Sequence, residues 1–157
     1  MLTSPISSFF CPTRNHLGIE THTQLASVLQ GYDCQRLFIA LDRALQGGDF
    51  YQRIEAILAE QNIATAVFTD IEADPSDTTV ERAFAVCRAH NATAILAVGG
   101  GSTMDVAKAV GILATNGGRI HDYEGIEKFS KPPLPLIAIP TTAGTGSEVS
   151  EIGRAHV

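Results

Sequence analysis

Three consecutive glycines, followed at once by hydroxyl and carboxylate side chains, form the segment of this chain best suited to chemistry. The segment reads Gly99, Gly100, Gly101, Ser102, Thr103, Met104, Asp105. Glycines do not hold a ligand at a distance, and the N–H groups at a helix N-terminus attract phosphate oxygens. Ser102 or Thr103 can add a hydroxyl donor, and Asp105 can orient hydroxyls or waters. The pattern therefore predicts a phosphate-binding turn, with a tight strand-to-helix turn as the alternative.

A second segment combines hydroxyl groups with glycines. It reads Thr141, Thr142, Ala143, Gly144, Thr145, Gly146, Ser147, Glu148. Hydroxyls and accessible backbone suit the second phosphate, the nicotinamide ribose and the carboxamide of a dinucleotide, so Thr141, Thr142 and Thr145 are candidate contacts. Ser147 is not predicted to be a nucleophile, because no GxSxG turn surrounds it. A plain polar loop is the alternative.

Asp42 comes directly after the apolar run Leu37 to Leu41. A buried strand does not tolerate an unpaired charge, so this carboxylate is expected to face solvent or a ligand. We interpret it as a hydrogen-bond partner of an adenosine ribose, and an exposed turn aspartate is the alternative. A carboxylate there repels a 2′-phosphate and favours NAD over NADP. NADP stays possible, because the neighbouring Arg43 can accept that phosphate.

These segments are connected by alternating strands and helices. Continuous apolar runs predict buried strands at 37–41, 64–68, 94–98 and 136–139, and amphipathic patterns predict helices at 21–30, 50–61, from 76 or 77 to beyond 87, and 103–115. This order predicts an α/β fold with a mostly parallel sheet flanked by helices, as in a Rossmann-like dinucleotide-binding domain. Ligands bind such sheets at the carboxyl ends of the strands. Asp42, the glycine turn and the threonine loop are therefore expected to meet at one edge.

Composition excludes several classes of protein. The 157 residues are 45% hydrophobic and 18% charged, which is typical of a folded domain and not of a disordered chain. With 11 basic and 17 acidic residues and a net charge of −6, general nucleic-acid binding is not expected. No apolar run reaches the roughly 18 residues of a membrane span. Three cysteines without CxxC spacing suggest reduced thiols in a cytoplasmic protein. The five scattered histidines predict no metal site.

Two motifs resemble the iron-containing (group III) alcohol dehydrogenase family. The first is the run from Gly99 to Ala109, in which Asp105 and Lys108 lie at the family's spacing, followed by Asn116. The second is the longer run Leu134 to Val149. Smaller matches are Leu41–Asp42 and the N-terminal Pro12–Thr13 with Gly18, so that the resemblance covers about residues 9 to 150.

The resemblance implies NAD(P)-dependent interconversion of a primary alcohol and an aldehyde by hydride transfer. Family members join a nucleotide-binding α/β domain to an all-helical domain, whose aspartate and three histidines hold a divalent metal, usually Fe²⁺. The metal and a possible homo-oligomer are therefore expected of the full-length enzyme only. The cofactor contacts implied by matching positions are Asp42, Gly99, Gly100, Gly101, Ser102, Asp105, Thr141, Thr142 and Thr145. Asp74–Pro75 departs from the family's frequent Asn-Pro.

The last residues do not resemble the family. Ile152 to Val157 matches the translation of a common sequencing adapter, so we expect a non-native tail at 152–157, with a natural short tail as the alternative. Residues 1–151 are then expected to form a truncated dinucleotide-binding domain, without the helical metal domain and without turnover of its own. Two other functions remain open: a lyase domain of the dehydroquinate-synthase type, which the threonine loop disfavours, and a stand-alone nucleotide-binding module.

Overall fold

A parallel four-stranded sheet in the order β2-β1-β3-β4 forms the centre of the molecule. The computed structural model describes residues 13–123 and 128–147, so the N-terminal Pro12 and the expected tail at 152–157 lie outside the described residues. The strands are β1 Arg36–Leu41, β2 Ala64–Phe68, β3 Ala94–Gly99 and β4 Leu136–Pro140. The four predicted strands and their parallel arrangement are confirmed.

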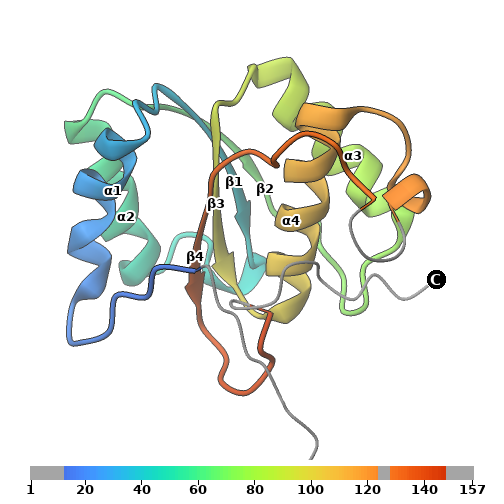
Figure 1. Ribbon diagram of the computed structural model, residues 1–157. Helices are drawn as coiled ribbons and strands as arrows, with labels where there is room; N and C mark the ends of the chain where they lie inside the picture. The colour runs from blue at the N-terminus through green and yellow to red at the C-terminus, as the bar shows by residue number, and fades with distance from the viewer. Residues whose placement is uncertain (1–12, 124–127, 148–157) are drawn as a thin grey trace, which may run out of the picture.

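Helices cover both faces of the sheet (Figure 1). On one face lie α1, Leu25–Gly31, and α2, Asp49–Glu60. On the other lie α3, Asp77–His90, and α4, Gly101–Asn116. Strands that are consecutive in the sequence are therefore connected through a helix that packs on the sheet, as the alternating pattern of the sequence predicts. The predicted Rossmann-like α/β architecture is confirmed.

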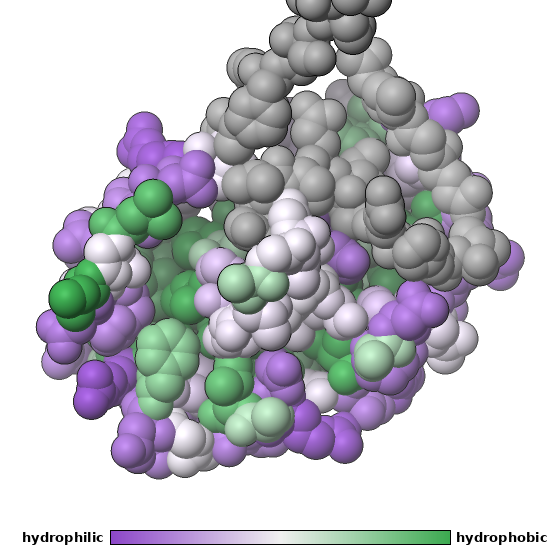
Figure 2. Space-filling model, turned by 90° about the horizontal axis from the view of Figure 1, so that it is seen from below, coloured by the Kyte–Doolittle hydropathy of each residue, from purple (hydrophilic) through white to green (hydrophobic). Residues whose placement is uncertain are grey.

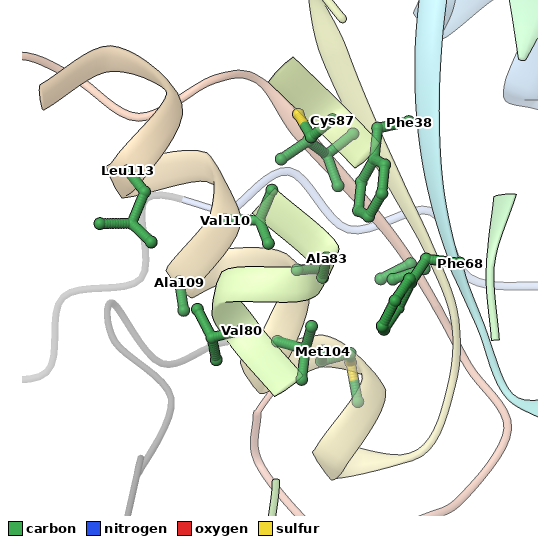
Figure 3. Packing of buried hydrophobic residues seen from close by; sticks show 14 residues of the cluster. Phe38, Phe68, Val80, Ala83, Cys87, Met104, Ala109, Val110 and Leu113 are labelled. Atoms are coloured by element: carbon green, nitrogen blue, oxygen red, sulfur yellow. The ribbon is translucent and has the colours of Figure 1, made fainter. Parts of the chain in front are cut away.

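The two inner strands supply the core on both faces. Every residue of β3 is buried, and β1 is buried from its second residue onward. Successive residues alternate between the faces: Phe38 and Ile95 pack under α3 and α4, whereas Leu37 and Leu96 pack under α1 and α2. Figure 3 shows the first of these clusters, in which Phe38 and Phe68 of the sheet meet side chains of α3 and α4.

Element boundaries differ from the sequence-based expectation at three places. The predicted helix at 21–30 begins with a 3-10 turn, Thr21–Gln24, before α1. The helix after the glycines begins at Gly101 and not at 103, because the extended Gly100 is already its N-cap. The stretch after α4, for which no helix was predicted, contains a further short 3-10 turn, Ile120–Tyr123.

Two of the cysteines are free and buried in the core. Burial raises the pKa of the Cys87 thiol to about 11 and also raises that of Cys34. At both positions burial therefore disfavours the thiolate, which is the reactive form of cysteine. Among the described residues, no helix is both long enough and apolar enough to cross a bilayer.

A carboxylate network fixes the start of α3. Ser76 is the N-cap, and its hydroxyl accepts from the Thr79 N–H at 3.4 Å. The Glu72 carboxylate accepts from the Ser76 N–H at 2.9 Å and from the buried Thr79 hydroxyl at 2.6 Å. These donors, the Ser76 N–H first, lower the pKa of Glu72 to about 2.

We expect Glu72→Gln to lower stability at pH 7 by about 0.5–1 kcal/mol, the value of a solvent-screened hydrogen bond. Because the pKa of Glu72 is depressed from 4.5, its contribution is complete above pH 4.5 and is lost as the pH falls toward 2. Urea unfolding of the unaltered chain and of Glu72→Gln, from pH 7 down to pH 2.5, measures the difference in the free energy of unfolding. A difference that stays constant with pH would contradict it, and Glu60→Gln, at the exposed end of α2, is the control.

Candidate dinucleotide-binding site

Three segments meet where the strands end. The register pairs Leu41 with Val98, and Gly99 with Pro140, so the residues that follow lie side by side at the carboxyl edge. The Asp42 N–H donates to the Val98 carbonyl and the Thr141 N–H donates to the Gly99 carbonyl, each at 2.9 Å. The predicted convergence of Asp42, the glycine turn and the threonine loop is therefore confirmed.

Contacts within the chain leave no room for a side chain at Gly99 and little room at Gly100 and Gly101. A Cβ on Gly99 would lie 2.5 Å from the Thr103 hydroxyl oxygen and 3.0 Å from Cβ of Asp42. A Cβ on Gly100 would lie 3.2 Å from the Thr142 hydroxyl oxygen. A Cβ on Gly101 would meet Ser147 Oγ and Thr145 Cβ, both at 3.3 Å. The sequence predicted a phosphate-binding turn with a closely packed turn as the alternative, and it could not show that the threonine loop packs on the glycine turn.

The N-terminus of α4 begins inside this junction. Its N-cap is Gly100, and no described side chain caps it, in contrast to Ser76 at the start of α3. The first N–H groups of a helix have no intrahelical acceptor and carry a partial positive charge. Main-chain N–H groups at a helix N-terminus that follows a strand end fit the pyrophosphate of a dinucleotide.

The predicted hydroxyl donors differ in exposure. Thr141, Thr142 and Thr145 are exposed, whereas Ser102 is half-buried. Thr103 is only 3% exposed, and its side chain packs against Gly99. Its position makes it a structural support of the turn, so it is a weaker candidate for a phosphate contact than the sequence suggests.

Lys108 fixes the threonine loop to α4. Its Nζ donates to the main-chain carbonyl of Ser147. From the sequence, an ion pair with Asp105 on the same helix was one of two equal interpretations of Lys108, and the contact with the loop was missed. Asp105 lies half-buried on the first turns of α4. Figure 2 looks onto this edge and shows residues of near-neutral hydropathy at its centre, as expected for threonine and glycine.

Asp42 is half-buried and has a structural role beside its candidate binding role. Its Oδ1 accepts from the Ala44 N–H at 2.9 Å and caps the 3-10 turn Arg43–Leu45. An ionised carboxylate has about four acceptor positions, so this cap leaves capacity for ribose hydroxyls. The turn-aspartate interpretation and the ribose interpretation are therefore compatible.

The spatial relation between Asp42 and the glycine turn matches that of common dinucleotide-binding sheets. In those sheets the glycine turn follows one strand, and the acid that binds the ribose follows its neighbour. Here the turn follows β3 and the acid follows β1, which pairs with β3. The acid precedes the glycines in sequence, yet the two lie side by side at the same edge.

The described residues do not include a metal centre. Among residues 13–123 and 128–147, no group of three or more His, Cys, Asp or Glu side chains is arranged to hold a metal ion. These residues by themselves therefore do not fit the Fe²⁺ that the family resemblance implies. The groups gathered at the carboxyl edge are instead main-chain N–H donors, threonine hydroxyls and the Asp42 carboxylate, which suit a nucleotide.

Comparison with known proteins agrees with this geometry. The family model described as iron-containing alcohol dehydrogenase matches residues 12–154. The chain belongs to this family. It is 36% identical over 146 residues to "Alcohol dehydrogenase 4" of Schizosaccharomyces pombe, a match that covers 93% of this chain and 35% of that protein.

Solved structures of the family share the fold. A crystal structure of 1,3-propanediol oxidoreductase superposes with a TM-score of 0.87 at 32% identity, covering 93% of this chain and 38% of that one. Sulfoacetaldehyde reductase from Bifidobacterium kashiwanohense, solved in complex with NAD⁺, gives a TM-score of 0.82 at 28% identity and covers 94% and 39% of the two chains. The chain thus spans a little over a third of the length of the family members it matches.

We expect Gly99→Ala to destabilise the protein by about 1–3 kcal/mol, because the added methyl group overlaps the Thr103 side chain. Gly31→Ala is the matched control: a Cβ there meets nothing within 4 Å, and alanine favours the helix by up to about 1 kcal/mol. Urea unfolding of both variants measures the difference. Equal stability of the two variants would show that the junction tolerates a side chain.

Proposed function

We propose that this chain binds NAD at the carboxyl edge of its sheet and forms the nucleotide-binding part of an alcohol dehydrogenase. In the whole enzyme, a primary alcohol and an aldehyde would be interconverted by hydride transfer. One observation carries the proposal: Asp42, the uncapped N-terminus of α4 and the threonine loop meet around Gly99.

Each segment has a role that its chemistry supports. The N–H groups of Gly100, Gly101 and Ser102 would donate to the pyrophosphate. The Asp42 carboxylate would accept from the adenosine ribose hydroxyls. The hydroxyls of the threonine loop would bind the second phosphate, the nicotinamide ribose and the carboxamide. Bound NAD supplies the nicotinamide ring that takes up the hydride.

Family membership supports the same assignment. A family member of known structure was solved with NAD⁺, and the present sheet superposes on it. Asp42 favours NAD over NADP, because its carboxylate repels a 2′-phosphate. The alcohol site and the divalent metal, Fe²⁺ or another, belong to the proposal for the whole enzyme, since the chain spans a little over a third of the family members that it matches.

Titration with NADH tests the binding step directly. The chain contains no tryptophan, so the fluorescence of bound NADH can be read without protein interference. We expect a saturable enhancement that excess NAD⁺ removes. Fluorescence that rises only linearly with NADH concentration, from a chain shown to be folded by circular dichroism, would contradict the proposal.

We expect Asp42→Asn to weaken NADH binding by about 1–2 kcal/mol, the contribution of a hydrogen bond to a charged acceptor. The amide oxygen can still accept from the Ala44 N–H, so the melting temperature is expected to change little. Asp33→Asn, an exposed residue that precedes β1 at the opposite edge of the sheet, is the charge-matched control. Equal affinities of the two variants for NADH would show that Asp42 only caps the 3-10 turn and does not bind the ribose.

A further inference from the structure

One carboxylate holds two arginines beside the candidate ribose site. Asp70 Oδ1 accepts from Arg43 at 2.8 Å, and Asp70 Oδ2 accepts from Arg82. Arg82 comes from α3, and its guanidinium lies 5.9 Å from the centre of the Phe68 ring. The hydrogen bond and charge of Arg82, followed by the charge of Arg43, keep the pKa of Asp70 below its ordinary value. The two arginines therefore favour the charged form of Asp70.

The network lies at the same edge as the nucleotide site. Asp70 follows β2 by two residues, and β2 pairs in parallel with β1, with Ala40 opposite Phe68. Arg43 follows Asp42 directly at the end of β1. The ends of β2, β1 and β3 thus carry, in spatial order, Asp70, Asp42 and the glycine turn.

Arg43 has the position and the chemistry of a 2′-phosphate ligand. An arginine near the ribose acid accommodates that phosphate in enzymes that use NADP, because its planar guanidinium binds phosphate oxygens with two donors. In this structure one of its terminal nitrogens already donates to Asp70. This ion pair orients the guanidinium of Arg43 toward Asp70, and the carboxylate of Asp42 repels a 2′-phosphate.

We propose that Asp70 is a positioning residue that makes the ribose site selective for NAD, by holding Arg43 away from the place of a 2′-phosphate. The inference rests on the proposed function and extends it from Asp42 to a residue 28 positions away in sequence. Asp70 does not touch the nucleotide. It acts through Arg43, and Arg82 fixes its orientation from the other side.

Competitive titration with NADH and NADPH tests this in the full 157-residue chain. In Asp70→Asn we expect the Kd for NADPH, divided by the Kd for NADH, to fall about twofold to fivefold, the upper part of the range of an exposed ion pair. The Kd for NADH itself is expected to stay within about twofold, because Asp42 is unchanged. Asp70→Glu, which retains the charge, is expected to keep the ratio of the unaltered chain.

Two controls separate the pairing from general electrostatics. Asp33→Asn removes the same charge from the opposite edge and is expected to leave the ratio unchanged. In the double variant Asp70→Asn with Arg43→Gln, we expect the ratio of the two Kd values to return to that of the unaltered chain, because the released guanidinium is then absent. A ratio that stays low in the double variant, without Arg43, would overturn the proposal.

A single variant keeps the inference testable if Asp70→Asn does not fold. Arg43→Gln alone is expected to leave the ratio within about twofold, since Asp70 already holds this guanidinium. A several-fold rise in the ratio would show that Arg43 already binds the 2′-phosphate, and would overturn the proposal. If the unaltered chain binds neither nucleotide, the proposed function fails. If it binds NADH but Asp70→Asn leaves the ratio unchanged, only this inference fails.

Discussion

The close contact of three strand ends at Gly99 is the constraint on which the candidate site depends. Parallel pairing places Asp42 on one side of this residue and Pro140, followed by Thr141, on the other. A side chain on Gly99 would overlap both Thr103 and Asp42. Hydrogen bonds from Asp42 and Thr141 to the main chain of β3 close the junction. The chain can therefore bring its acid, its helix N-terminus and its hydroxyl loop together only where a side chain is absent.

The packing of α4 against the sheet fixes the direction of the helix at this junction. Met104, Val106 and Val110 are fully buried under the sheet, so the helix cannot rotate without exposing them. A Cβ on Gly111 would lie 3.4 Å from Ile95, which shows how closely the helix approaches β3. The Leu134 N–H donates to the Gly111 carbonyl at 3.2 Å, so the same helix also guides the chain into β4. Core packing thus determines where the donors of the α4 N-terminus lie.

The strands and their edge could be predicted because the information is local or follows from a general rule. Leu37–Leu41 and Ala94–Val98 are continuous apolar runs, and parallel strands end at one edge. What could not be predicted depends on where separate loops lie in space. The pairing of Arg43 with Asp70 joins residues 27 positions apart, and Lys108 meets Ser147 across 39 positions. The start of α4 was placed two residues late, because glycine has a low helix propensity and tertiary packing overrides it here.

In the proposed nucleotide site the acid precedes the glycines, so such a site depends on which strands are neighbours and not on the order of the motifs in the sequence. A sequence motif such as GxGxxG requires the acid to follow the glycines, and by that criterion this chain would be excluded. The sheet requires only that the two strands pair, which β1 and β3 do along five residue pairs. Pairing of β2 with β1 likewise places Asp70, at the end of β2, next to Arg43. In the proposed site, selectivity for the nucleotide therefore also depends on β2, the neighbour of the strand that carries the ribose acid.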